Sequence, residues 1–108
     1  VGSEMCIRDS AYGYYYGALA LSTSERYVGR ALDYDSYAEA SQAARRACGY
    51  ADCKVVTRFA NGCGAIAESP SYWGFGNGSS LYSAQSEALY YSGSGAEIVY
   101  WACTSAHD

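Results

Sequence analysis

Residues 36–63 read SYAEASQAARRACGYADCKVVTRFANGC and predict a helix, a cysteine pair, a strand and a tight turn in direct succession. Alanines recur at helical spacing in the first part, where Ser36 suits an N-cap and Gly49 suits the stop after the helix. The run from Lys54 to Phe59 is rich in β-formers, and Asn61-Gly62 is a strong hairpin signal. The stretch therefore predicts one helix-and-strand unit of an α+β fold.

Composition limits the classes of partner. The chain has 108 residues, enough for one domain with a modest core. Its formal net charge is −4, and the basic residues are scattered singly except at Arg45-Arg46, so no basic stripe favours nucleic acid. No apolar run approaches the roughly 20 residues that span a bilayer. We therefore expect no nucleic-acid partner, no membrane span and no cofactor.

The first ten residues, Val1 to Ser10, have neither helical nor strand periodicity and no apolar centre typical of a signal peptide. This sequence looks like the translation of an adaptor read-through. We therefore expect residues 1–10 to be a non-native or disordered segment, followed by a single domain at 11–108. The alternative is a genuine flexible arm whose unpaired Cys6 links two chains.

An internal repeat organises the remainder, with repeat one at about 11–61 and repeat two at about 62–103. Each repeat has two strand-like runs, a helical run capped by serine (Ser36 and Ser79) and a final strand. We therefore predict an α+β fold in which two ββαβ pseudo-repeats form one mostly antiparallel sheet, with both helices on one face.

The repeat also bears on the cysteines. Aligning Val55 with Ile98 leaves no cysteine opposite either Cys48 or Cys53, and this joint absence indicates that the two bond to each other. The predicted disulfides are Cys48–Cys53 and, by elimination, Cys63–Cys103. Disulfides in so short a chain indicate an oxidising compartment, which is extracellular, periplasmic or at the cell surface.

These features resemble the secreted bacterial domain of unknown function family 4189. The matching motifs are Gly-Ala-Ile-Ala-x-Ser at 64–69, the Ala-rich helix ending in Cys48-Gly49, Cys53-Lys54-Val55-Val56, Asn61-x-Cys63 and a terminal strand ending in Cys103. The resemblance spans about 17–103. It implies secretion and a disulfide-held α+β fold, and it brings no catalytic residues.

The sequence gives little support for a zinc site or for a nucleophilic active site. A zinc site would have to combine Cys48 and Cys53 with Cys63, Cys103 or His107, and these form no second close pair. His107 is the only histidine, and its place near the end of the chain favours a solvated tail residue over a catalytic base.

Two pairs of acidic residues are candidates for catalysis or for calcium binding. Glu68 and Glu97 lie on strands that can be neighbours, and such a carboxylate pair can serve a glycosidase. Asp33 and Asp35 do not begin a calcium loop, because the later positions of that loop are not met. Asp35 beside the cap fits stabilisation of the helix dipole instead.

The second repeat concentrates glycines and aromatic residues. Gly74, Gly76 and Gly78 lack the lysine or the spaced third glycine of a phosphate loop, so they fit a twisted strand. Asn77-Gly78-Ser79 has the form of an N-glycosylation acceptor in a loop. The predicted contact surface comprises Tyr72, Trp73, Phe75, Tyr100 and Trp101.

The leading hypothesis is a secreted, non-catalytic interaction module that binds a cell-envelope component, a protein partner or itself. One alternative is a self-assembling subunit of an extracellular filament or surface layer, because open sheet edges permit strand addition and a homo-oligomer or fibre. Another is a cell-wall hydrolase or an inhibitor of one, dependent on Glu68 and Glu97.

Overall fold

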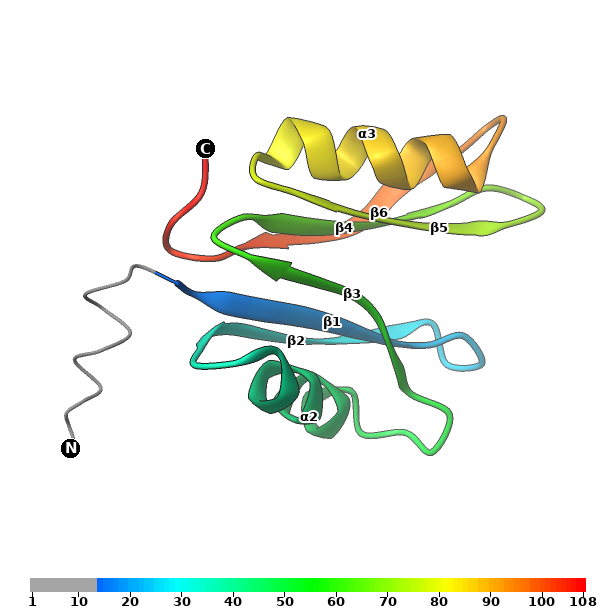
Figure 1. The fold of residues 1–108 in the computed structure, drawn as a ribbon. Coiled ribbons are helices and arrows are strands. Elements are labelled where there is room, and N and C mark those ends of the chain that lie inside the picture. The colour runs from blue at the N-terminus through cyan, green and yellow to red at the C-terminus, as the bar shows by residue number, and fades with distance from the viewer. Residues whose placement is uncertain (1–13) are drawn as a thin grey trace, which may run out of the picture.

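The computed structural model describes residues 14–108, which form six strands and two helices (Figure 1). In chain order they are β1 (Tyr16–Ser22), β2 (Tyr27–Tyr34), α2 (Tyr37–Cys48), β3 (Lys54–Ala60), β4 (Cys63–Glu68), β5 (Trp73–Gly78), α3 (Leu81–Ser92) and β6 (Glu97–Cys103). Both halves therefore have the order strand, strand, helix, strand. The expectations for Val1 to Ser10 and Cys6 lie outside the described residues.

The strands form two antiparallel three-stranded sheets of identical design. One sheet has the order β2-β1-β3 and the other the order β5-β4-β6, so the first strand of each half is central. In the second sheet Cys63 at the start of β4 lies opposite Cys103 at the end of β6. The α+β class and the antiparallel pairing are those predicted.

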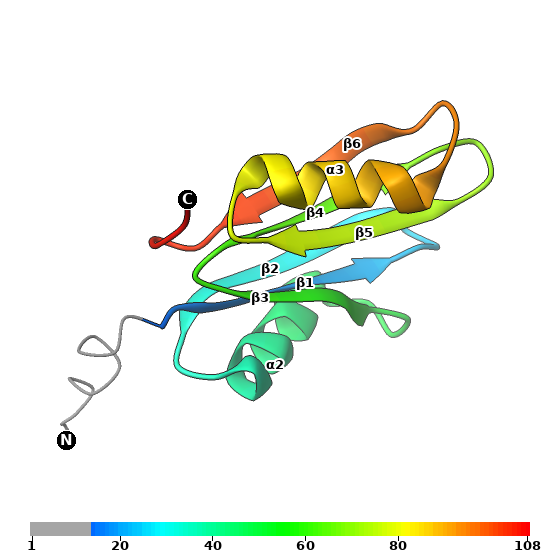
Figure 2. The ribbon, with the colours of Figure 1, turned by 45° about the horizontal axis from the view of Figure 1, so that its top comes forward.

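The layers differ from the prediction of one sheet with both helices on one face. The two sheets face each other, and α2 and α3 cover the two outer sides (Figures 1 and 2). The reason is that both faces of each central strand are apolar. Ala18 and Ala20 pack toward α2, whereas Leu19 packs toward the other sheet. One sheet with both helices on one face would leave Leu19 and its counterpart Ile66 in water.

The core between the sheets is built around Phe59. Leu19, Phe59, Ile66 and Ala102 are buried there. The ring of Phe59 lies against Gly17 of one sheet and Gly64 of the other, where an added Cβ would overlap ring carbons. Two glycines therefore allow a single large ring to lie between the two halves.

The helices pack unusually close to their sheets. The buried residues of α3 are Ala84, Ala88 and Ser92, and an added Cβ on Gly74 or Gly76 would overlap the backbone of α3. In the first half, a Cβ on Gly29 would likewise overlap the backbone of α2. Small residues thus form both helix–sheet contacts, and the larger side chains of the helices must lie elsewhere.

The cap of α2 is the predicted residue, whereas the cap of α3 lies one residue after the predicted one. Ser36 caps α2 by accepting from the N–H of Glu39, and Gly49 ends the helix with φ +80°, as predicted. The cap of α3 is Ser80 rather than Ser79, because the Ser80 hydroxyl accepts from the N–H of Ser83 and the side chain of Ser83 reciprocates.

Neither helix of residues 14–108 is long and apolar enough to cross a membrane.

Candidate contact surface

The five aromatic residues predicted to form a contact surface do not lie together on the exterior. Trp73, Phe75 and Tyr100 are half-buried and pack against the core between the sheets. Tyr72 and Trp101 are exposed, with 67% and 49% of their surface accessible. The strand alternation explains the division, because neighbouring residues of β5 and β6 point to opposite faces.

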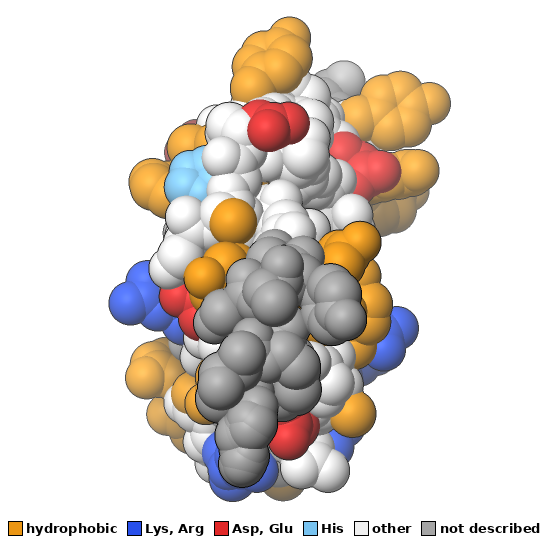
Figure 3. All heavy atoms as spheres, turned by 60° about the vertical axis from the view of Figure 1, so that its left-hand side comes forward, with side chains coloured by type: hydrophobic (Ala, Val, Ile, Leu, Met, Phe, Trp, Pro, Cys, Tyr) orange, Lys and Arg blue, Asp and Glu red, His pale blue; other side chains and the backbone are white. Residues whose placement is uncertain are grey.

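A second group of exposed aromatic residues lies on α3. Tyr82 and Tyr90 are 81% and 79% exposed, and Tyr91 and Leu89 are also exposed. The rings of Tyr90 and Tyr91 meet edge to face with their centroids 5.2 Å apart. Hydrophobic side chains project at the top of Figure 3, on the side of α3. We call Tyr82, Leu89, Tyr90 and Tyr91 the α3 surface.

The α3 surface carries almost no charge. Glu87 is the one charged residue of α3, and its Oε1 accepts the backbone N–H of Asn77 at 2.8 Å. The equivalent helix α2 exposes Glu39, Arg45 and Arg46 together with a single tyrosine, Tyr37. Two helices with the same place in the fold thus differ in the side chains that they present to solvent.

The loop before β5 carries a further exposed aromatic residue, Tyr72. Ser92 at the end of α3 donates its hydroxyl to the backbone carbonyl of Tyr72 at 2.9 Å, and Ser69 donates to the carbonyl of Ser92 at 2.7 Å. These bonds fix the loop that carries Tyr72 against the end of the helix. Tyr72 therefore lies in a loop that is bonded to the end of α3, and its ring is exposed.

Arg26 connects the two sheets at one end of the molecule. Its guanidinium forms two hydrogen bonds with the Glu68 carboxylate, both at 2.5 Å, and lies 5.5 Å from the centre of the Trp73 ring. The hydrogen bonds and the charge of Arg26 lower the pKa of Glu68. This contact joins the β1–β2 turn of the first half to β4 and β5 of the second.

The turn that holds Arg26 is braced by the loop of the first disulfide. Asp52 accepts the hydroxyl of Ser22 at 2.6 Å and the hydroxyl of Ser24 at 2.9 Å. These hydroxyl bonds lower the pKa of Asp52. Asp52 lies in the loop closed by Cys48–Cys53, and Arg26 itself has φ +54°. The short disulfide loop therefore helps to position Arg26 on Glu68.

Glu68 and Glu97 are direct partners across β4 and β6, so the structure brings the predicted acids together. A glycosidase needs one carboxylic acid whose pKa is raised so that it can donate a proton. Arg26 instead lowers the pKa of Glu68. The lowered pKa therefore keeps Glu68 ionised and does not suit it to the role of the proton donor in such a pair.

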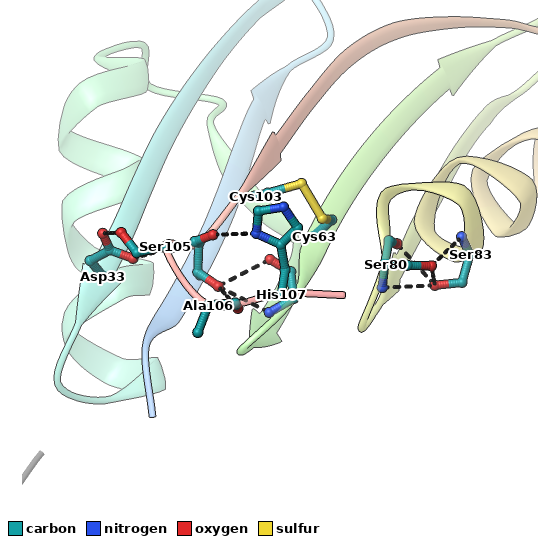
Figure 4. Close-up of a disulfide and its surroundings, with 10 residues drawn as sticks. Asp33, Cys63, Ser80, Ser83, Cys103, Ser105, Ala106 and His107 are labelled. Carbon is teal, nitrogen blue, oxygen red and sulfur yellow. Dashed lines mark hydrogen bonds between the residues drawn. A yellow bond between two sulfur atoms is a disulfide. The ribbon is translucent and has the colours of Figure 1, made fainter. Parts of the chain in front are cut away.

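Both disulfides are formed between the cysteines expected to pair, Cys48 with Cys53 and Cys63 with Cys103. The imidazole of His107 and the sulfurs of Cys63 and Cys103 lie within 4.8 Å of one another (Figure 4). Thiolate ligation of a metal requires free sulfurs, and these two are bonded to each other. The cluster is therefore a disulfide beside an imidazole.

The residues after β6 are held in place by hydrogen bonds, although His107 itself is exposed, as expected from the sequence. The Thr104 N–H donates to the carbonyl of Gly62, and Ser105 donates both its N–H and its hydroxyl to Asp33 (Figure 4). Asp33 has φ +64°, a conformation that aspartate tolerates better than most residues. The N–H of Asp108 bonds to the carbonyl of Ser79.

The glycine run and the predicted glycosylation residue both lie on a strand. Gly74, Gly76 and Gly78 belong to β5, as the expected twisted strand requires, and an added Cβ on any of them would overlap atoms of α3. Asn77 lies on the same strand. The side chain of Asn77 is exposed. The location expected for Asn77 in a loop was wrong.

Comparison with known proteins gives a consistent picture. The family model "Domain of unknown function (DUF4189)" matches residues 16–103. Protein Rv1269c of Mycobacterium tuberculosis is 42% identical over 88 residues, which are 82% of this chain and 68% of that protein. The uncharacterized protein Rv1813c of the same species is 38% identical over 89 residues, or 82% of this chain and 60% of that protein.

A solved structure is also similar. The NMR structure of Rv1813c from Mycobacterium tuberculosis superposes with a TM-score of 0.68 at 38% sequence identity, and the match covers 82% of this chain and 74% of that one. The five residues from Thr104 to Asp108, including His107, lie outside the stretch that the family model matches.

Proposed function

Given that the chain belongs to the DUF4189 family of domains of unknown function, we propose that it is a secreted, non-catalytic interaction module that binds a protein partner through the α3 surface and Tyr72. The observation that carries the proposal is the contrast between α2, which exposes charged residues, and α3, which exposes Tyr82, Tyr90 and Tyr91.

The chemistry of this surface favours a protein as the partner. Protein–protein contacts are enriched in tyrosine and depleted of charged side chains at their centre. A tyrosine ring covers a large area at a small cost in conformational entropy, and its hydroxyl satisfies polar groups of the partner. A patch of exposed apolar rings on a soluble domain marks an interaction site more often than a folding requirement.

The frame behind the surface is rigid. The close contact between α3 and β5 leaves no room for the helix to approach further, and Ser80 and Ser83 cap its start. A preorganised surface loses little conformational freedom on binding. The two disulfides are consistent with an extracellular location, which the proposal adopts.

Site-specific photo-crosslinking in the cells that produce the protein tests the proposal. A benzoylphenylalanine replaces Tyr82 in one variant, Tyr90 in a second, and Glu39 on α2 in a control. We expect one discrete heterologous protein adduct from the two α3 positions and none from position 39. The same adducts from all three positions, or no adduct from α3, would reject the proposal.

The contact residues supply a second arm of that experiment. With the crosslinker at position 91, the changes Tyr82→Ser and Tyr90→Ser together should greatly reduce the adduct, because they remove the two most exposed rings. An adduct with twice the mass of the chain would instead assign the surface to self-association and contradict a separate partner.

A further inference from the structure

The disulfide between Cys63 and Cys103 borders a cavity of about 610 Å³. The cavity lies where β2, β6, the start of α3 and the last residues meet, and Cys103 forms part of its lining. Cys63 is fully buried, whereas Cys103 is partly exposed. A molecule that enters the cavity therefore reaches this disulfide at Cys103.

The only histidine of the chain lines the same cavity. Nδ1 of His107 lies 2.7 Å from the carbonyl oxygen of Thr104. A carbonyl oxygen can only accept, so Nδ1 is the donor of this bond and Nε2 is left free of it. Figure 4 shows the ring lying against the Cys63–Cys103 bond, with its other nitrogen on that side.

The backbone that carries this exposed imidazole is anchored. Thr104 is buried, and its hydroxyl lies 3.0 Å from the N–H of Gly62, from which it accepts. Ser105 is bonded twice to Asp33. Hydrogen bonds on both sides of Thr104 therefore hold the histidine beside the sulfurs, which is the geometry of a base or acid kept in register by a third group.

We propose that Cys63–Cys103 is an exchange-reactive disulfide that captures the thiol of a partner peptide, with His107 as its proton donor. The partner thiolate attacks the sulfur of Cys103, a new sulfur–sulfur bond forms there, and the Cys63–Cys103 bond breaks. The electron pair of the broken bond remains on Cys63, and the imidazolium of His107 gives that sulfur its Nε2 proton. One disulfide replaces another, so no external oxidant or reductant is consumed.

The remaining lining of the cavity suits such a partner. Leu32, Leu81 and Trp101 supply an apolar wall for a side chain beside the reacting cysteine. Arg30 of β2 adds a positive charge that favours an approaching thiolate, and Asp108 is the acid that borders the cavity. The proposal is independent of the α3 surface, and its reaction is stoichiometric.

The second disulfide is an internal control. Cys48–Cys53 belongs to the other half of the molecule and lacks a histidine, because the chain has only one. Oxidised protein is incubated under native conditions with reduced glutathione, and separately with a short peptide that carries a cysteine beside a leucine, from pH 5 to 9. Acid quenching, alkylation and peptide mass spectrometry then give the exchange rate at each cysteine.

We expect mixed disulfides at Cys103, and a rate per thiolate at Cys63–Cys103 that is roughly tenfold or more above that at Cys48–Cys53 below neutral pH. His107→Gln should remove most of this advantage and change its dependence on pH, because the glutamine amide cannot take the place of the imidazole as a proton donor. Asp108→Asn and Arg30→Gln test the other charged side chains that border the cavity, and Asp33→Asn tests the acid that anchors Ser105.

Two results would overturn the proposal. One is exchange at Cys63–Cys103 that is no faster than at Cys48–Cys53. The other is an unchanged pH profile in the His107→Gln protein. Unfolding cannot imitate the expected result, because global opening accelerates both disulfides together, and the ratio of the two rates is the quantity measured.

Discussion

Gly76 decides how closely a helix approaches its sheet. An added Cβ would overlap the carbonyl oxygen of Ala84, which is backbone and cannot turn away. We predict that Gly76→Ala lowers the free energy of unfolding by about 1–3 kcal/mol through overpacking. Urea unfolding monitored by circular dichroism measures the change. Asn77→Ala is the matched control, since that side chain is exposed on the same strand, and an equal loss in both proteins would contradict the packing argument.

The ion pair of Arg26 and Glu68 makes stability depend on pH in a defined direction. The pKa of Glu68 is below its ordinary value of 4.5 in the folded protein, because Arg26 bonds to the ionised form. Its contribution is therefore fully present above the unfolded pKa and is lost as pH falls through the folded pKa. Asp52, whose pKa is also lowered, contributes with the same sign.

We predict that Glu68→Gln makes the protein less stable at pH 7 and flattens the loss of stability on acidification. Urea midpoints measured from pH 3 to 7 test this. Arg26→Gln should produce a similar flattening, and the double variant should add little to either single change, because both side chains act in one contact. Parallel curves for the wild type and Glu68→Gln would show that the pair does not contribute.

At the scale of elements, the cap of α3 can be assigned by a pair of neighbouring substitutions. The Ser80 hydroxyl accepts the N–H of Ser83 at 3.1 Å, whereas Ser79 accepts the N–H of Asp108 through its backbone carbonyl. We predict that Ser80→Ala costs about 1 kcal/mol of stability, and that Ser79→Ala changes it by less than about 0.5 kcal/mol. Thermal unfolding distinguishes them, and the reverse ranking would place the cap at Ser79.

The helices and strands follow local rules, and this is why sequence patterns predict them, whereas the cysteine pairs were predicted from the internal repeat. Caps at Ser36 and Gly49, the Asn61-Gly62 turn and the alanine spacing each depend on neighbouring residues. The pairing of sheets and the exposure of aromatics depend on distant contacts. Phe59 between Gly17 and Gly64, and Arg26 on Glu68, have no local signature.

The sequence does contain a pattern that predicts the exposed side chains of the α3 surface. Gly74 and Gly76 on one strand, with Ala84 and Ala88 on the following helix, indicate a helix–sheet contact made by small residues. Once the inward positions are small, tyrosines on the same helix must face solvent. Trp73 and Phe75 alternate with these glycines and are therefore directed to the opposite, sheet-facing side.

At the scale of the whole molecule, two halves of equal design are joined by one shared core. Each half has its own helix–sheet layer, but Leu19 and Phe59 of the first half bury their side chains against Ile66 and Ala102 of the second. Neither sheet can separate without exposing this apolar core to water. The disulfides, by contrast, are each confined to one half.

These facts predict that residues 14–108 unfold as one unit. Trp73 and Trp101 both lie in the second half, so their fluorescence reports that half, whereas far-ultraviolet circular dichroism reports both. We expect the two probes to give the same urea midpoint. Replacing Cys63 and Cys103 by alanine should cost roughly 4 kcal/mol, against roughly 2 kcal/mol for Cys48 and Cys53, because the first bond closes the longer loop. A tryptophan transition that separates from the circular dichroism transition would show that the halves unfold independently and that the shared core is weaker than its burial indicates.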